Sequence, residues 1–254
     1  MREGSLIEVS GLRVQYGNSV ALENVSFQVH AGERIAVVGP NGAGKSTLFH
    51  TLAGLKKAQA GSVLMHSTSN NPLNIAFLPQ RPTLDWTFPM SVLDAVQLGL
   101  SLKLSRHEAK RESLDALDLV SLGDLAKTRI NRLSGGQQQR VLIARALAVK
   151  ADALLMDEPL VGLDTPSRES VFNCLDTLTE RNIPVMVALH DLNLAAARFS
   201  RTMLINKTLI ADGKPTDIFT TENLTATYGS HLHVVRTEDG AVLVSDTCCG
   251  GGHG

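Results

Sequence analysis

A glycine-rich stretch near the N-terminus has the residue types and the spacing needed to hold a phosphate group. It fits the pattern G-x-x-x-x-G-K-S/T. Its glycines leave consecutive backbone N–H groups uncovered, so that these groups can curl around an anion. The lysine can reach the β- and γ-phosphates, and the serine hydroxyl can complete the shell of a Mg²⁺ ion. The predicted site residues are Gly39, Pro40, Asn41, Gly42, Ala43, Gly44, Lys45, Ser46 and Thr47.

The elements that must position this loop are encoded on both sides of it. The apolar run 35–38 predicts a buried strand that leads into the loop, and residues 47–53 predict a short helix that leaves it. Gly54 is suited to end this helix. The positive end of the helix would point at the same anion as the loop. Strand, loop and helix together predict the binding of a nucleoside triphosphate.

A second stretch predicts another anion site at the start of a helix. Ser134 and Gln137 have the spacing of a capping box, and residues 138–147 predict the helix behind them. Gly135 and Gly136 leave the backbone donors of that helix end uncovered. Two phosphate sites at opposite ends of one chain suggest two chains that face each other head to tail.

This second stretch, Leu-Ser-Gly-Gly-Gln at residues 133–137, resembles the signature sequence of the ATP-binding cassette (ABC) family. In that family the signature of one subunit closes over the γ-phosphate that the other subunit holds. The resemblance therefore implies a second copy of this chain as a partner. It also implies ATP and Mg²⁺ as the cofactors, two of each between the two copies.

The catalytic residues of the ABC family have counterparts further along the chain. The apolar strand predicted at 153–156 ends in Asp157 and Glu158, which resemble the Walker B motif and its catalytic carboxylate. The resemblance implies that Asp157 holds Mg²⁺ through water and that Glu158 deprotonates the attacking water. His190, after a strand predicted at 185–189, resembles the switch histidine that contacts the γ-phosphate. Adjacent acids or a lone histidine at a strand end are common structural features, and only their order after the phosphate loop favours catalysis.

Three more residues extend the resemblance. Gln80 resembles the Q-loop glutamine, which senses Mg²⁺ and the γ-phosphate and links the core to a helical subdomain. Tyr16 matches the aromatic residue that stacks on adenine, and a half-buried strand residue is the alternative interpretation. Asp164 belongs to a stretch that looks like the D-loop, which crosses the dimer interface. Because no catalytic position is missing, the resemblance implies an ATP hydrolase.

The expected fold is α/β, a P-loop NTPase of the ABC ATPase type. It comprises an N-terminal antiparallel β-subdomain, a mixed α/β core and an inserted α-helical subdomain. Residues 5–29 predict an antiparallel β-meander, and a capping box at Ser105 and Glu108 predicts a helix over 109–120. Short apolar strands are expected near 35–38, 63–66, 75–78, 153–156, 185–189, 202–206 and 208–211.

We expect a single ABC ATPase domain over residues 1–246. Its β-subdomain and core would take residues 1–80 and 133–230, its helical subdomain 81–132 and a terminal hairpin 231–246, before a flexible tail at 247–254.

Charge and composition exclude several classes of function. The 254-residue chain carries 24 Lys and Arg against 25 Asp and Glu, without the basic excess that nucleic-acid binding usually leaves. No apolar run is long enough for a membrane span, and the first residues do not begin a secretory signal. We therefore expect a cytoplasmic protein, peripheral on the inner face of the cell membrane, whose permease is another chain. Three cysteines do not make a disulfide framework, and Cys174 is expected to be a small core residue.

Transport is the work that we expect ATP hydrolysis to drive. DNA-repair relatives insert long coiled coils between Q-loop and signature, where this chain has about fifty residues, the size of a compact helical domain. Ribosome-acting relatives usually carry two cassettes and a basic linker. Both non-transport roles are therefore disfavoured.

The segment after the Q-loop is the best guide to the substrate. Asp85-Trp86, then Phe88-Pro89 and Ser91-Val92, resemble ATPases of manganese, zinc and iron importers, which partner a divalent-cation permease and an extracytoplasmic binding protein. The alternative is that Trp86 and Phe88 are apolar contacts for any permease. An ATPase of a haem or iron-chelate importer is the second possibility, because the sequence at residues 189–195 is common there too.

The C-terminal tail carries residues that suit a soft or borderline cation. Cys248, Cys249 and His253 stand on a glycine-rich tether, with His231 and His233 upstream, and could bind Zn²⁺. The two cysteines are adjacent rather than at C-x₂-C spacing, and a closed site needs a fourth ligand. A flexible tail with fortuitous ligands is the alternative, and the two upstream histidines could equally line a solvated strand edge.

Overall fold

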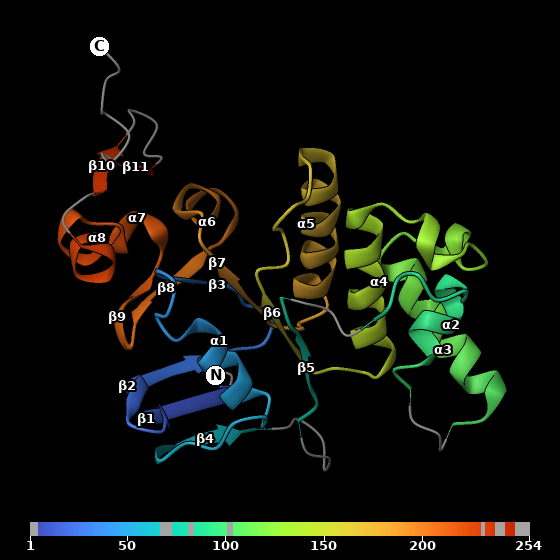
Figure 1. The fold of residues 1–254 in the computed structure, drawn as a ribbon, viewed down its shortest axis with the longest axis horizontal. Coiled ribbons are helices and arrows are strands. Elements are labelled where there is room, and N and C mark those ends of the chain that lie inside the picture. The colour runs from blue at the N-terminus through green and yellow to red at the C-terminus, as the bar shows by residue number, and fades with distance from the viewer. Residues whose placement is uncertain are drawn as a thin grey trace. The chain divides into compact units, whose positions relative to one another are not determined.

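The computed structural model describes residues 5–66, 73–80, 84–100, 104–229, 232–236 and 242–246, the last two stretches as backbone only (Figure 1). The chain divides into two compact units. One comprises residues 1–72 and 186–254, and the other comprises residues 73–185.

A three-stranded antiparallel sheet forms the N-terminal part of the first unit. Its strands are β1 (Ile7–Tyr16), β2 (Ser19–Val29) and β4 (Ala60–Met65), in the order β2-β1-β4. Ile7 pairs with Val29 on one side and with Met65 on the other. The meander predicted for residues 5–29 is therefore a two-stranded hairpin. The third strand is β4, whose mostly exposed residues show little of the alternation that marks a half-buried strand.

The phosphate loop lies between a buried strand and a helix of the same unit. β3 (Arg34–Val38) precedes it, and α1 (Lys45–Leu52) follows it. β3 pairs in parallel with β8 (Arg201–Asn206), which pairs antiparallel with β9 (Thr208–Gly213). The predicted end of the helix is confirmed, because Gly54 has a φ of 72°. The unit also contains α6 (Leu192–Arg198), α7 (Pro215–Ile218) and α8 (Thr221–Tyr228).

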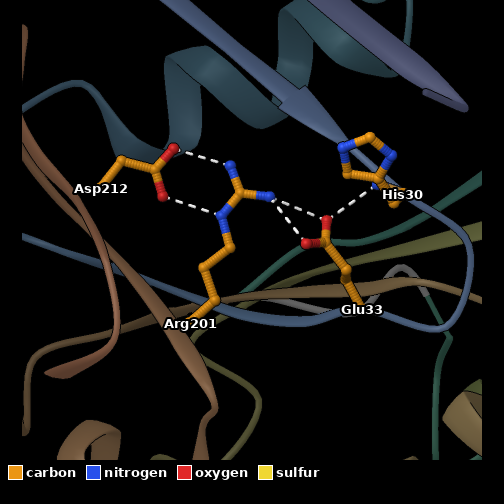
Figure 2. A network of polar contacts seen from close by, with 4 residues as sticks. All are labelled: His30, Glu33, Arg201 and Asp212. Carbon is orange, nitrogen blue, oxygen red and sulfur yellow. Dashed lines mark hydrogen bonds and ion pairs between the residues drawn. The ribbon is translucent and has the colours of Figure 1, made fainter. Parts of the chain in front are cut away.

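One arginine joins β8, β9 and the turn that leads into β3, as Figure 2 shows. Arg201 donates to both carboxylate oxygens of Glu33, at 3.0 and 2.8 Å, and to both of Asp212, at 2.8 and 2.7 Å. The backbone N–H of His30 donates to Glu33 at 2.8 Å. The hydrogen bond to Asp212 raises the pKa of Arg201 against the effect of burial. This bidentate network fixes the register of β3, β8 and β9 relative to one another.

The second unit contains two parallel strands and most of the long helices. β5 (Ile75–Leu78) pairs in parallel with β6 (Ala153–Asp157). α4 (Gly135–Ala148) packs against α2 (Val92–Gln97), α3 (Arg106–Leu119) and α5 (Thr165–Glu180). Short 3₁₀ turns lie at Gly123–Leu125 and Ile130–Arg132. β7 (Val185–Leu189) begins at the last residue of this unit and continues in the first.

Local signals for the helix ends are confirmed. The capping box at Ser105 and Glu108 is present, and α3 begins directly after Ser105. The sequence places this start three residues later, at 109, because the polar first turn carries no apolar periodicity. Cys174 lies buried on α5, as expected, and burial raises the pKa of its thiol to about 12.

The last described stretches form the predicted hairpin, in which β10 (Leu232–Arg236) and β11 (Val242–Asp246) pair antiparallel. The predicted domain boundaries stay a prediction. Within the described part of the chain, no helix is both long and apolar enough to cross a membrane.

Candidate active site

The phosphate loop is shaped by glycines that lack room for a side chain or adopt a positive φ. A Cβ at Gly39 would overlap the carbonyl oxygen of Ile205, so the loop begins directly against β8. Gly44 has a φ of 101°, and a Cβ there would lie 2.6 Å from the carbonyl oxygen of Ala21. Gly42 also has a positive φ, of 78°. Only glycine adopts these conformations without strain, so the curl of the loop is fixed by the sequence.

Lys45 spans the phosphate loop from inside. Its side chain is 5% exposed, and Nζ donates to the carbonyl oxygens of Gly39 at 2.6 Å and Pro40 at 3.1 Å. The first turn of α1 carries no acidic residue and no side-chain cap, and Ser46 is exposed there. A positive ammonium group and an uncapped helix N-terminus therefore act together on one loop, an arrangement that attracts an anion.

Tyr16 is the last residue of β1, and 48% of it is exposed. The ammonium group of Lys56 lies 4.1 Å from the centroid of its ring. Such a cation holds the aromatic plane at the surface. Nothing in the spacing of the sequence singled out Lys56, because the two residues belong to separate elements.

Asp157 is the last residue of β6 and Glu158 follows it, at the edge where the neighbouring strand β5 also ends. Asp157 is 6% exposed, and its Oδ1 is buried without a hydrogen-bond partner among the described residues. An unpaired buried carboxylate oxygen is costly unless a cation or a bound water satisfies it. Glu158 has a φ of 53°, which is unusual for a residue with a side chain. Its Oε2 accepts a 2.7 Å hydrogen bond from the side-chain amide of Gln80, which follows β5.

The predicted capping box at the signature is present. Ser134 is the N-cap of α4, and its hydroxyl accepts from the N–H of Gln137 at 3.3 Å. In return Oε1 of Gln137 accepts from the N–H of Ser134 at 2.9 Å. Ser134 and Gly135 are exposed, whereas Gly136 is buried. The first turn of α4 carries no acidic residue, so its N-terminus suits an anion.

Asp164 and His190 each lie just before a helix. Asp164 is the N-cap of α5 and accepts from the N–H of Ser167 at 3.1 Å. His190 is exposed and follows the last residue of β7. Its neighbour Asp191 caps α6 by accepting from the N–H of Leu194 at 2.9 Å. The histidine is thus held between a buried strand and a capped helix.

The candidate residues fall into two sets. Tyr16, the phosphate loop and His190 belong to the first unit, and Gln80, Asp157, Glu158, the signature and Asp164 belong to the second. Sequence reasoning missed Ser167, which touches the signature helix and carries no motif of its own. The proposed tail ligands Cys248, Cys249 and His253 lie outside the described residues, as does His231, and nothing is described of the His233 side chain. In the described ranges no cluster of three or more His, Cys, Asp or Glu residues could hold a metal ion.

A family profile described as an ABC transporter matches residues 22–161, more than half of the 254 residues. The chain belongs to the ABC transporter family. It is 40% identical over 233 residues to the manganese transport system ATP-binding protein MntB of Listeria monocytogenes, covering 88% of this chain and 96% of that protein. It is 38% identical to MntB of Bacillus subtilis, over 91% of this chain and 95% of the relative. It is also 36% identical to the zinc transport system ATP-binding protein TroB of Treponema pallidum, over 89% of this chain and 88% of the relative.

Solved structures confirm the predicted ABC ATPase fold. A chain from an inward-facing ABC transporter of proposed metal-chelate type has a TM-score of 0.78 at 28% identity, covering 95% of this chain and 96% of that one. The cbiO1 protein of Clostridium perfringens, part of the ABC transporter complex cbiONQ, has a TM-score of 0.75 at 26% identity, covering 88% and 94%. The protein is thus an ATP-binding subunit of an ABC transporter, an enzyme that couples ATP hydrolysis to transport.

Proposed function

We propose that this chain hydrolyses ATP to power the uptake of a divalent transition metal, manganese, zinc or iron, through a separate membrane permease. The observation that carries the substrate class is its identity of 36–40% over nearly the whole chain with ATP-binding proteins named for manganese and zinc transport. The Asp-Trp and Phe-Pro pairs at residues 85–86 and 88–89 point the same way.

In this proposal the phosphate loop of residues 39–47 holds the ATP phosphates. Lys45 neutralises charge on the β- and γ-phosphates, and Tyr16 presents a ring face to the adenine. The buried Oδ1 of Asp157, which has no hydrogen-bond partner among the described residues, fits a role toward Mg²⁺. Ser46, Gln80 and Asp157 would hold the ion, directly or through water. When bound, Mg²⁺ neutralises charge that develops on the transferred phosphoryl group.

Hydrolysis then depends on a proton acceptor and on residues that hold the reacting groups in line. Glu158 takes the proton of the attacking water, and the hydrogen bond from Gln80 orients its carboxylate. His190 contacts the γ-phosphate. The signature of a second copy completes each site through Ser134, the backbone N–H groups of Gly135 and Gly136, and Gln137. Asp164 lies in the loop that crosses between the copies.

The permease is the expected membrane partner, and the helices of the second unit offer it a surface. A hollow of about 450 Å³ there is lined by Leu100, Leu104, Val149 and the ion pair of Glu112 and Lys150, among others. Exposed apolar residues such as Leu98, at 58%, add to this surface. A mixture of apolar and charged groups suits a helix end or loop of a membrane protein. The protein would then act on the inner face of the membrane, with an extracytoplasmic metal-binding protein as an indirect partner and no nucleic acid.

Reconstitution tests the proposal directly. The chain is expressed with a candidate divalent-metal permease and inserted into liposomes, and ATP-dependent uptake of radioactive manganese and zinc is measured. A Glu158→Gln version is the matched control. Metal uptake by the wild type alone supports the proposal.

A haem or iron-chelate importer is the second candidate, favoured by the structural similarity to a transporter of proposed metal-chelate type. Uptake of haem or a ferric chelate without uptake of free metal ions in the same liposomes would decide for this candidate.

A further inference from the structure

The signature helix of this chain starts in close contact with the helix behind the D-loop. Gly136 lies in the first turn of α4, and Ser167 lies in the first turn of α5. A Cβ at Gly136 would lie 2.5 Å from Cβ of Ser167, 2.6 Å from its Oγ and 3.0 Å from its Cα. Carbon atoms do not approach so closely without a shift of one partner. Position 136 therefore has no room for a side chain within this chain alone.

The neighbouring signature glycine is less constrained. Gly135 is exposed, and among the described residues a Cβ there would meet only Cδ2 of Leu163, at 3.1 Å. That atom is the far end of a side chain that can rotate away. The two adjacent glycines are thus under different steric constraints, although both belong to the same motif.

Ser167 cannot easily yield to a larger residue at position 136. Its N–H donates to Oδ1 of Asp164 at 3.1 Å, and Pro166 stiffens the same turn of α5. Nε of Arg168 donates to the carbonyl oxygen of Leu163 at 3.0 Å. Hydrogen bonds from the side chain and backbone of Ser167 hold the pKa of the exposed Asp164 carboxyl below its usual value, so the acceptor stays ionised. These local bonds make the start of α5 a stiff support.

We propose that Ser167 is a positioning residue, which sets where the first turn of the signature helix stands, and that position 136 requires glycine because Ser167 of the same chain fills the space. This rests on the proposed function, in which the signature acts on ATP held by a second copy. A side chain at 136 would displace the first turn of α4 away from α5. The ATP site on the same chain would keep its phosphate loop, so binding would survive while turnover falls.

A rescue experiment on the full-length chain tests this contact. We compare Gly136→Ala, Ser167→Gly, the double variant and Gly135→Ala for kcat and KM of ATP hydrolysis, with thermal unfolding as the folding check. The matched control is the double variant of Gly136→Ala with Ser170→Gly. Ser170 lies one turn further along α5, and its hydroxyl donates to the carbonyl oxygen of Pro166. If Gly136→Ala does not fold, Ser167→Thr adds bulk to the same gap from the opposite side.

We expect Gly136→Ala, and more mildly Ser167→Thr, to lower kcat by about tenfold to a hundredfold, because a displacement of about 1 Å has that effect on an aligned group. KM should stay within about twofold. Ser167→Gly removes the two nearest atoms and leaves the 3.0 Å contact with Cα, so the double variant should regain a large part of kcat, whereas the Ser170→Gly control should not. Gly135→Ala should lower kcat less than Gly136→Ala does, because the one side-chain atom that its Cβ would meet can rotate away.

Two results would overturn the proposal: a folded double variant as slow as Gly136→Ala, or an exposed Gly135 more sensitive to alanine than Gly136. Either result would mean that position 136 requires glycine because the nucleotide comes close to it, and not because of Ser167. Unchanged turnover in both Gly136→Ala and Ser134→Arg would instead show that the signature does not act at the ATP site. The proposed function of the signature and this proposal would then both be wrong.

Discussion

The side-chain amide of Gln80 donates a 2.7 Å hydrogen bond to Oε2 of Glu158, across 78 residues of sequence. The two residues meet because β5 and β6 are parallel neighbours that end at the same edge. The Q-loop and the proposed general base are therefore in direct contact within one unit of the chain. A substitution at Gln80 should therefore alter the orientation of the Glu158 carboxylate directly, without a movement elsewhere in the chain.

Removing this hydrogen bond should slow the chemical step. Gln80→Ala is expected to lower kcat by about tenfold or more, because the carboxylate loses one of the groups that orient it. Gln97→Ala, a like exchange at the end of α2, serves as the control and should leave kcat unchanged. Steady-state ATP hydrolysis measures both. A wild-type kcat in a folded Gln80→Ala protein would show that Gln80 does not orient the Glu158 carboxylate for catalysis.

Glu158 and Lys45 should separate chemistry from binding. Glu158→Gln should keep ATP binding, lower turnover by roughly 10²-fold or more, and trap a dimer with bound ATP, because a carboxamide cannot accept the proton. Lys45→Ala should weaken ATP binding itself, since the buried ammonium group of the loop is lost. Fluorescent-nucleotide binding, hydrolysis and size-exclusion chromatography distinguish the two. Wild-type turnover in Glu158→Gln would exclude Glu158 as the base.

Mixing two inactive variants should restore activity if each site is built from two chains. Lys45→Ala disables the phosphate loop, and Ser134→Arg places bulk at the exposed start of the signature helix. A mixed dimer keeps one site with an intact loop and an intact facing signature. ATP hydrolysis by the mixture should exceed that of either parent. If tagged mixed dimers form and stay inactive, the assignment across the two copies is wrong, or both sites must act together.

The arginine network should matter for stability rather than for catalysis. Arg201→Ala leaves Glu33 and Asp212 facing each other without a cation, and Arg201 is 20% exposed, so we expect a loss of about 2–4 kcal/mol in the free energy of unfolding. The triple variant with Glu33→Gln and Asp212→Asn should recover part of this loss, because the unpaired charges are gone. Urea unfolding gives both values. Equal stability of Arg201→Ala and wild type would mean that the network contributes nothing.

The tail prediction concerns Zn²⁺ and not ATP. Deleting the residues after Asp246 should leave ATP hydrolysis unchanged, because the described site residues all lie before it. Calorimetric titration of chelator-washed proteins should show weaker or less Zn²⁺ binding by the truncated chain, most clearly above pH 7, where tail thiolates are more available. Cys174 should not interfere, since burial raises the pKa of its thiol to about 12. Equal Zn²⁺ stoichiometry and affinity in both proteins would leave the tail a flexible end.

The sequence by itself determined the features that arise from short spacings. The curl of the phosphate loop follows from glycines that adopt positive φ, as at Gly42 and Gly44. The capping boxes at Ser105 and Ser134 follow from a partner three residues away. Such interactions depend on a few consecutive dihedral angles, so the residue pattern is enough to predict them.

Only the tertiary structure decided the contacts that join distant segments. Gln80 reaches Glu158, Ser167 fills the space above Gly136, and β4 completes the sheet of β1 and β2. None of these pairs has a pattern of its own, because each is set by which strands and helices bury their apolar faces together. Burial of apolar surface depends on the whole core at once. Which two distant residues become neighbours is therefore decided only when the core packs.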